Sequence, residues 1–591
     1  MQLNYSALRS YLRWIPWGRA DAERAPRDGD VGQAHAPPIR VWRRLGLRAL
    51  GWLKVNESPT PVKWSERSRA TRGTTWGLLA LVVFVMAVLR RGWMCDDAFI
   101  TMRVVDHLVA GRGMVFNAGE RVLGITNPLW ALVLAGPLAL TQNHYLVAVL
   151  AGVVTSALAA SVLVFAVARD RALGALVLVA LCFSRSFVDF STSGLENSLT
   201  HLLLFCFYAV LFRPAVRSSG KLVLLSALTV VNRIDALPLL LPGLLWTLWQ
   251  ERRRKGLWWR VLLGATPAIA WFVFAIIYYG FPSPNTTYAK LNTDIPRAEM
   301  VRQGFSYLID VVANDSLTAI LIAAALAISI QAIRTQRLAK FVLLALIANL
   351  AYVVSVGGDF MSGRFMTAAT AVSAAALVHF GGELLRGPSG LPLQGLALGL
   401  GALIMSLTFS PFRLEKETEK RDFPYTRIVN ERSWYQDHLL LPMNVRPTAW
   451  REDGLFTSGV EARQRKERVA VVGNIGLFGL GAGPDVHVLD PLALTDPLLA
   501  RIPFKYDRGW RTGHLGRDVP EGYVKSLEEG RNLIEDRCLA EYYDRLNQVI
   551  RGPLFTRERW EAIIALNSPG GVTVRPCPQK PKTKRPGRRL H

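Results

Sequence analysis

The sequence predicts an α-helical multi-pass membrane protein with about eleven spans, followed by an extracytoplasmic α/β domain. Three observations lead to this fold class. The chain has 591 residues, of which 51% are apolar and 19% charged, and its mean hydropathy is +0.22. The apolar residues fall in long blocks separated by short Arg/Lys clusters, as in membrane helices joined by cytoplasmic loops. After Phe409 the composition becomes mixed and polar, and no further apolar span follows.

The chain carries 70 Lys and Arg against 45 Asp and Glu, a formal net charge of +25. This charge does not indicate disorder, because apolar residues dominate the chain. It does not indicate nucleic-acid binding either, since basic residues between hydrophobic spans typically face the anionic cytoplasmic leaflet. The five cysteines form no CxxC motif and no Cys/His cluster, so the sequence shows neither a zinc site nor a redox motif.

Residues 1–73 form a basic N-terminal extension that we expect in the cytoplasm. Within it, the stretch VWRRLGLRALGWLKV (41–55) has the Leu and Trp spacing of an amphipathic helix on a lipid surface. A disordered basic tail is the alternative. The extension is not a secretory signal, because the first apolar span begins only after Arg72 and no cleavage pattern follows that span.

The membrane domain is expected at 74–410. Its spans are predicted from the apolar blocks, with ends uncertain by a few residues. The candidate spans are 74–91, 145–168, 172–188, 198–213, 221–231, 236–250, 258–279, 316–334, 338–356, 365–385 and 391–410.

Two interpretations decide the topology. Pro128–Leu140 is apolar, but as a helix it would be roughly 20 Å long, too short for a hydrocarbon core of about 30 Å, so we expect an interfacial or re-entrant helix. Lys221–Gln250 is long enough for one span but carries Asn232, Arg233 and Asp235 in its middle. Charges at mid-bilayer are costly, so two short helices that meet at a polar corner are predicted instead.

With these two choices, the basic clusters between spans lie on the same side as the basic N-terminus. The positive-inside rule makes this side cytoplasmic. Changing either choice alone would move the cluster Arg252–Lys255 to the outside. The expected topology in the plasma membrane therefore has the N-terminus inside and the C-terminal domain outside.

The C-terminal domain is expected at 411–577, followed by a disordered basic tail at 578–591. In an oxidising compartment Cys538 and Cys577 could form a disulfide. The glycines that follow RVAVVGN could suggest a dinucleotide-binding fingerprint. The gap before the next strand, DVHVL, is too short for a full crossover helix, so a glycine-rich turn in a small α/β domain is predicted.

The polar motifs all fall in loops on the predicted outer side, directly at span ends. Such a gathering of ionisable groups at one membrane face predicts a cavity that acts on a charged or hydroxylated substrate. The loops contain CDDAF (95–99), GRGMVFNAGERVLGITNP (111–128), STSGLEN (191–197), NRID (232–235), GFPSPNTTYAKL (280–291) and GGDFMSGRF (357–365).

Asp96 and Asp97 are adjacent carboxylates a few residues beyond the first span. At the rim of a low-dielectric cavity one of them could have a raised pKa and act as the base for a hydroxyl acceptor. They could instead hold a divalent cation through their oxygens, which is the only cofactor that the sequence suggests. A helix N-cap or a solvated loop pair is the alternative without a catalytic role.

Three cations on the same side, Arg233, Lys290 and Arg364, could neutralise a phosphate. Each could equally anchor at lipid headgroups or form an ion pair. Glu196 and Asp359 could pair with these cations or contact sugar hydroxyls. His514, in the motif RTGH, could face the acceptor or the cavity, or be a hydrogen-bonded structural histidine.

Taken in order, the motifs DDAFI, FNAGERV, TNPLW, TSGLE, N-R-x-D, PNTTYAK and GGDFM-x-GRF resemble the GT-C class of membrane glycosyltransferases. Within that class the chain is similar to the actinobacterial family that adds terminal β-(1→2) arabinofuranose to cell-wall arabinan. The similarity continues through VNERSWYQ, GNIGLFGLGAGPDVHVLDPLALTDPL and RTGHLGRDVP, and covers roughly 74–577.

This resemblance implies transfer of a sugar, D-arabinofuranose, from a polyprenyl-phosphate donor to a hydroxyl of a cell-envelope glycan outside the cell. Asp96 or Asp97 matches the catalytic acidic motif of the family. The resemblance places Lys290 and Arg364 at the donor phosphate, and Arg233 is a further candidate there because of its charge. The substrate-binding candidates are Asn127, Glu196, Asp235, Asp359 and His514.

The NRID corner, the GITNPLW segment and the N-terminal extension depart from the usual family pattern. These departures concern the acceptor and the sugar. The alternatives are a transferase of the same fold that glycosylates a protein or lipopolysaccharide, and a transporter of lipid-linked sugars. A transporter is expected to bind its ligand near mid-membrane between repeats, and the sequence shows no clear internal repeat.

Overall fold

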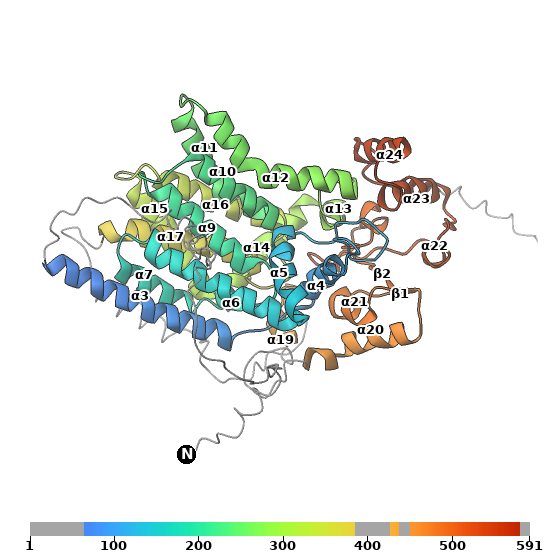
Figure 1. Cartoon of the computed structure of the whole chain (residues 1–591), viewed down its shortest axis with the longest axis horizontal. Coiled ribbons are helices and arrows are strands. Elements are labelled where there is room, and N and C mark those ends of the chain that lie inside the picture. The colour runs from blue at the N-terminus through green and yellow to red at the C-terminus, as the bar shows by residue number, and fades with distance from the viewer. Residues whose placement is uncertain (1–63, 385–425, 436–448, 579–591) are drawn as a thin grey trace, which may run out of the picture. The chain divides into compact units, whose positions relative to one another are not determined.

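The computed structural model describes residues 64–384, 426–435 and 449–578, and the described residues from Ser65 onward form one compact unit. The fold is mostly helical (Figure 1). The amphipathic segment at 41–55, the expected span at 391–410 and the tail from 579 lie outside the described residues.

The first described part contains most of the apolar helices. In chain order its elements are α3 (Trp64–Arg90), α4 (Asp96–Val109), α5 (Pro128–Thr141), α6 (His144–Val162), η3 (Leu163–Val167), α7 (Arg171–Leu181), α8 (Arg185–Asp189), α9 (Asn197–Phe212), α10 (Ser219–Asn232), η4 (Ile234–Ala236), α11 (Leu237–Glu251), α12 (Leu257–Tyr279), α13 (Asn285–Leu291), α14 (Arg297–Asn314), α15 (Ser316–Ala332), α16 (Ala339–Ser355), η5 (Arg364–Met366) and α17 (Thr367–Leu384).

The later residues, 426–435 and 449–578, are called here the C-terminal segment. They contain α19 (Glu431–Trp434), η7 (Ala449–Glu452), α20 (Gly454–Gln464), β1 (Val469–Val471), α21 (Ile475–Ala482), β2 (His487–Leu489), η8 (Leu499–Arg501), α22 (Tyr523–Glu529), α23 (Arg537–Ile550) and α24 (Arg557–Asn567).

Among the described residues, four helical segments are long and apolar enough to cross a membrane: Thr71–Arg90, His144–Val167, Leu257–Tyr279 and Arg364–Gly382. Helices α14 and α15 meet the same criterion together, although they are bent by 108°. Other apolar helices, including α9 and α16, are shorter than 18 residues. The chain therefore has the helices of a membrane protein, and the number of about eleven spans stays a prediction.

The expected span 172–188 is wrong as one continuous helix. Helix α7 ends at Leu181, and the short helix α8 follows from Arg185. The break is stabilised by polar groups, because Asp315 accepts hydrogen bonds from the backbone N–H groups of Arg185 and Ser186. The first N–H groups of a helix have no partner within the helix, and here a buried carboxylate accepts their hydrogen bonds. The break between the two helices therefore leaves these groups satisfied.

The polar corner predicted within 221–250 is confirmed. Helix α10 ends at Asn232, Arg233 has an extended backbone, and α11 begins at Leu237 after the turn η4. The extended residue ends the hydrogen-bond ladder of α10 and directs the Arg233 side chain to carboxylates on neighbouring elements.

The predicted glycine-rich turn after RVAVVGN is wrong. Residues 475–482 form the helix α21, which joins the parallel strands β1 and β2. Small residues let this helix pack closely on its neighbours: a Cβ at Gly479 would meet Phe116 and Arg103, and a Cβ at Gly481 would meet the backbone of Phe456. These small residues allow α21 to pack against both α4 and α20 while it joins the two strands.

Helix α21 of the C-terminal segment packs against α4, and the two lie side by side in Figure 1. One hydrophobic cluster contains Phe99 from α4, Trp130 from α5, Leu477 from α21 and Val488 from β2. The buried guanidinium of Arg103 adds hydrogen bonds to the carbonyls of Phe116, Gly479 and Val486. The C-terminal segment thus shares a core with the helices that carry the polar loops.

Gly304 lies where α14 crosses α16. A Cβ at this position would lie 2.6 Å from the Cα of Val354 and even closer to its carbonyl oxygen. We expect Gly304→Val to force the helices apart and to lower the free energy of unfolding by about 1–3 kcal/mol. Thermal unfolding of the detergent-solubilised protein measures this change. Gly136→Ala, in α5, is the control, because a Cβ there meets nothing within 4 Å. Equal stability of Gly304→Val and wild type would contradict this packing.

Candidate active site

The polar loops predicted from the sequence converge in the structure. Glu196, at the start of α9, lies at the centre of their contacts. Its carboxylate accepts a hydrogen bond from Asn127 Nδ2 (2.8 Å) and one from the Arg233 guanidinium (2.9 Å). A second guanidinium, that of Arg364, lies 3.6 Å away. Loops far apart in the sequence are thus joined through one buried carboxylate, whose charge is compensated by two arginines.

Arg233 donates hydrogen bonds to two carboxylates. Its Nε and Nη2 atoms donate to Asp235 at 2.8–3.0 Å, and its Nη1 atom donates to Glu196. The ring of Phe365 lies 5.2 Å from the guanidinium carbon. Each of its three nitrogens thus donates to a carboxylate, and these two carboxylates already compensate its charge. The geometry therefore favours an ion pair, one of the three roles that the sequence left open for Arg233.

Arg364 is in a different environment. Its guanidinium lies 3.6–3.9 Å from the carboxylates of Asp97, Glu196 and Asp359, too far for a short hydrogen bond to any of them. Its Nε atom and the Oδ2 atom of Asp359 are buried without a hydrogen-bond partner. A buried arginine with unused donor capacity can receive an anionic ligand without losing an existing bond.

The loop that holds Asp359 and Arg364 has a defined backbone. Gly363 has a φ of +73°, and a Cβ there would overlap Ser186. Residue Met361 pairs with Val429 of the C-terminal segment in a short parallel bridge. The glycine turns the chain into η5, so that Arg364 stands at the start of the apolar helix α17.

The two adjacent aspartates have different roles in the structure. Asp96 accepts hydrogen bonds from the backbone N–H groups of Gly476 (3.0 Å) and Leu477 (2.7 Å), so it caps the N-terminus of α21 rather than its own helix. Asp96 is 7% exposed, whereas the Asp97 side chain is 33% exposed and makes no hydrogen bond among the described residues. Of these two aspartates, Asp97 is the one whose carboxylate is available to a ligand.

Asp97 opens into a pocket, which we call the aspartate pocket. Residues of the first part and of the C-terminal segment line it together. The lining consists of Asp96, Asp97, Ile100, Lys290, Phe360, Glu431, Tyr435, Gly473, Asn474, Ile475, Leu492, Leu494, Gly513 and His514. Next to it, a second pocket has Arg233, Asp235 and Arg364 among its lining residues, and we call it the arginine pocket. Arg364, close to Asp97, connects the two.

Lys290 reaches the aspartate pocket from the end of α13. Its side chain is exposed and forms no ion pair among the described residues. The helix is held by Asn285, whose amide group donates to the carbonyls of Ala493 and Asp496 and accepts from Arg501. The motifs PNTTYAK and LDPLALTDPL therefore meet in space, and their contact positions a free ammonium group at the pocket.

His514 lines the same pocket with its ring edge-on to Phe360, at a centroid distance of 4.4 Å. Burial lowers the pKa of His514 to about 4, with a further contribution from the positive charge of Arg511. The imidazole is therefore neutral at pH 7 and can accept or donate a hydrogen bond.

The carboxyls of the pocket have perturbed acidities. Burial raises the pKa of Asp97, although the charges of Arg364 and Lys290 act in the opposite direction. Burial also raises the pKa of Asp96 to about 6, against the effect of its two backbone hydrogen bonds. Glu431 has a pKa raised to about 8, first by burial and then by the charge of Asp97. Such shifts are typical of carboxyls that take part in acid–base chemistry.

Sequence reasoning did not single out Glu431, Tyr435 or Asn474, which also line the pocket. Glu431 and Tyr435 belong to VNERSWYQ and Asn474 to the glycine-rich stretch, and both motifs contributed only to the family resemblance. These three residues reach the pocket because the C-terminal segment packs against α4.

The carboxylates of the pocket do not form a compact metal site. Among the described residues, the group of possible ligands that lie together is Asp536, Cys538 and Cys577. The structure joins Cys538 and Cys577 in a disulfide, the pair that the sequence suggested, and their sulfur atoms are therefore not thiolate ligands. A divalent cation between Asp96 and Asp97 stays a prediction.

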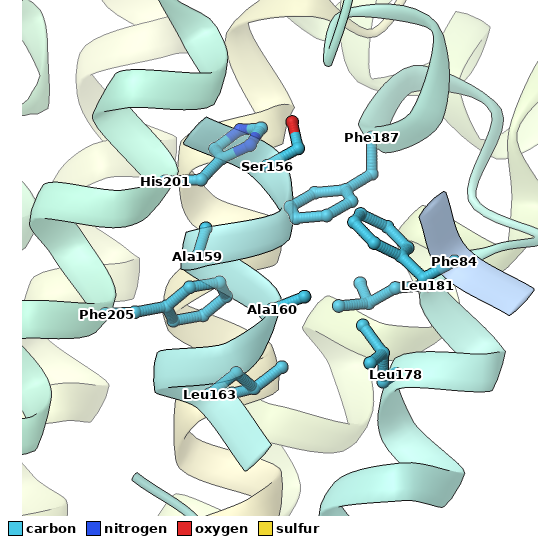
Figure 2. Close-up of a pocket in the computed structure, with 10 residues that line it drawn as sticks. All are labelled: Phe84, Ser156, Ala159, Ala160, Leu163, Leu178, Leu181, Phe187, His201 and Phe205. Carbon is cyan, nitrogen blue, oxygen red and sulfur yellow. The ribbon is translucent and has the colours of Figure 1, made fainter. Parts of the chain in front are cut away.

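A further pocket lies among α3, α6, α7, α8 and α9 (Figure 2). Phenylalanine, leucine and alanine side chains make up most of its wall, and the ring of Phe187 stacks on His201. The hydroxyl of Ser156 and the Nε2 atom of His201 have no hydrogen-bond partner there. With no carboxylate or cation in its lining, this cavity lacks the groups that the aspartate pocket combines.

Comparison with known proteins agrees with the motifs. The chain is 26% identical to a terminal beta-(1->2)-arabinofuranosyltransferase of Mycobacterium tuberculosis, in an alignment that covers 71% of this chain and 80% of that enzyme. It is 30% identical to an enzyme of the same name from Corynebacterium glutamicum, over 47% of this chain and 46% of that enzyme. No family model and no solved structure matches the chain. Both relatives support the glycosyltransferase family that the motifs of this chain predict.

Proposed function

We propose that the protein transfers an arabinofuranosyl residue from a polyprenyl-phosphate donor to a hydroxyl group of a cell-envelope glycan at the outer face of the plasma membrane. The observation that carries this proposal is the shared pocket of Asp97 and Lys290, with Arg364 directly beside it. The pocket combines a carboxylate and cations at the ends of apolar helices. A lipid-borne phosphate and a sugar hydroxyl would have to meet at such a place.

Asp97 is the proposed base. Its exposed carboxylate faces the pocket, whereas the carboxylate of Asp96 is occupied by the N-terminus of α21. The acceptor hydroxyl transfers its proton to Asp97 as its oxygen forms the new bond to the anomeric carbon. The bond between that carbon and the donor phosphate oxygen breaks, and the polyprenyl phosphate leaves with the electron pair.

Lys290 and Arg364 are the proposed phosphate-binding groups. Negative charge grows on the phosphate as the bond to the sugar breaks, and cations positioned beforehand stabilise that charge. Lys290 is free of ion pairs among the described residues, and Arg364 retains a buried Nε–H without a partner. Arg233 is instead proposed to hold Glu196 and Asp235 in place, because its donors already bind these carboxylates.

The outer location rests on the distribution of basic loops. The turn Arg252–Lys255 connects α11 and α12, and Trp249, Trp258 and Trp259 beside it are exposed. Aromatic residues next to basic ones are typical of the boundary between lipid and cytoplasm. The polar corner of Arg233 lies at the other end of α11, so the pocket is proposed to face the opposite side of the membrane.

Asp97→Asn is expected to lower kcat by about 100- to 10,000-fold, because the amide cannot take up the proton. The unfolding temperature of Asp97→Asn should stay close to that of wild type. The variant Asp96→Asn should instead have a lower unfolding temperature, because an amide binds the N-terminus of α21 less strongly than a carboxylate does. The measurement is transfer of labelled arabinofuranose from decaprenyl phosphate to an arabinan oligosaccharide, with the exposed Asp485→Asn as control. Full activity of Asp97→Asn would exclude it as the base.

Lys290→Met and Arg364→Gln are each expected to lower kcat by about 10- to 1,000-fold, because each removes a cation from the leaving phosphate. Binding of a non-transferable polyprenyl-phosphate analogue should weaken as well. Lys525→Met is the matched control, on an exposed face of α22. Unchanged analogue binding in both variants would exclude the two cations from the phosphate site.

The reaction rate should fall at acidic pH, because a base acts only when it is ionised. Since burial raises the pKa of Asp97, the acidic limb of kcat/KM should lie above the pH of an ordinary carboxyl titration. Replacing Lys290 by Met removes a charge that lowers this pKa, so the limb should move to higher pH. The pH profile of the control Lys525→Met should coincide with that of wild type. If the profile of Lys290→Met also coincided with wild type, Asp97 would not be the base.

A further inference from the structure

Glu431 is the one carboxyl of the aspartate pocket contributed by residues 426–435 of the described chain. It is the first residue of the short helix α19, directly after Val429 and Asn430. Its side chain forms no hydrogen bond and no ion pair with other described residues, although Asp97 and Arg511 are close enough to influence its charge. A carboxyl held in a pocket without a protein partner is available to a ligand.

The residues on both sides of Glu431 are anchored to the membrane helices and their loops. Val429 donates its N–H to the carbonyl of Phe360 and accepts from the N–H of Ser362. On the other side, Arg432 is buried, donates to the carbonyl of Arg91 and lies 3.9 Å from Asp189. Because both neighbours are fixed, the backbone holds Glu431 at the pocket beside Asp97 without any bond from its own side chain.

The surroundings of Glu431 suit a sugar rather than a phosphate. The charged groups with the largest influence on Glu431 are Asp97, Arg511, Asp96 and Asp359, so carboxyls outnumber cations among them. A phosphate would be repelled here, whereas a hydroxyl can both donate to and accept from a carboxyl. Phe360 and Tyr435 also line the pocket, so aromatic side chains lie beside the carboxyls, as in many sites that bind small organic molecules.

We propose that Glu431 binds a hydroxyl group of the acceptor sugar, so that the C-terminal segment supplies part of the acceptor site. This inference rests on the proposed transfer reaction. In the resulting arrangement, Lys290 and Arg364 hold the donor phosphate, Asp97 takes the proton, and Glu431 orients the sugar that is attacked. The raised pKa of Glu431 agrees with this role, because a carboxyl that is largely neutral at pH 7 can act as donor and acceptor at once.

The test measures initial rates with decaprenyl-phosphate arabinofuranose and a synthetic arabinofuranosyl oligosaccharide, varying each in turn. Glu431→Ala should raise the acceptor KM about 10- to 100-fold, the usual effect of losing one hydrogen bond to a substrate. The donor KM and the slow hydrolysis of the donor without acceptor should stay within about twofold of wild type. Glu431→Gln should recover most of the acceptor binding, because an amide also donates and accepts. Glu558→Ala, on an exposed face of α24, is the matched control.

The outcomes separate this inference from the proposed function. If wild type transfers no arabinofuranose, the proposed function fails and the inference falls with it. If wild type is active and Glu431→Ala keeps the acceptor KM of wild type, only the role of Glu431 is overturned. A parallel loss of donor hydrolysis and acceptor use in both Glu431 variants would show a structural role and would also overturn it. Donor hydrolysis at the wild-type rate establishes that the variant is folded.

Discussion

The site depends on compensation of charge that is buried at the ends of apolar helices. A carboxylate or guanidinium in this environment is stable only when an opposite charge or several hydrogen bonds accompany it. Glu196, Arg233 and Asp235 satisfy this condition among themselves at hydrogen-bonding distances. Their network holds α9 against the corner between α10 and α11. Arg364 is held less tightly, at 3.6–3.9 Å from its carboxylates, and this looser compensation leaves it able to bind an anion.

A second constraint joins the C-terminal segment to the membrane helices. The carboxylate of Asp96 binds the free N–H groups at the start of α21, and glycines allow this helix to approach α4 closely. The aspartate pocket exists because of this contact, since Asp97 and Lys290 come from one part and Glu431 and His514 from the other. The two adjacent aspartates therefore differ in role: Asp96 holds α21, which forms one wall of the pocket, and the side chain of Asp97 is exposed within the pocket.

The arrangement agrees with what glycosyl transfer from a lipid phosphate requires. Cations are needed at the depth of the phosphate, a base is needed beside the acceptor hydroxyl, and the two must be close without cancelling each other's charge. Arg364 lies 3.9 Å from Asp97, near enough to affect its acidity but too far for a short hydrogen bond that would occupy it. The part of the pocket near Glu431 is rich in carboxyls and suits hydroxyl groups. The part near Lys290 and Arg364 carries cations and suits a phosphate.

The sequence by itself determined the membrane character, the polar corner at Arg233 and the set of polar loops, because hydropathy and the cost of buried charge act locally along the chain. It also indicated the pair Cys538 and Cys577 and the family. Only the tertiary structure decided that Asp96 and Asp97 have different environments. Nothing in the sequence says which of the two binds the N-terminus of α21. The helix α21 itself and the place of Glu431 depended in the same way on packing between segments more than three hundred residues apart in numbering, a distance over which local pattern carries no information.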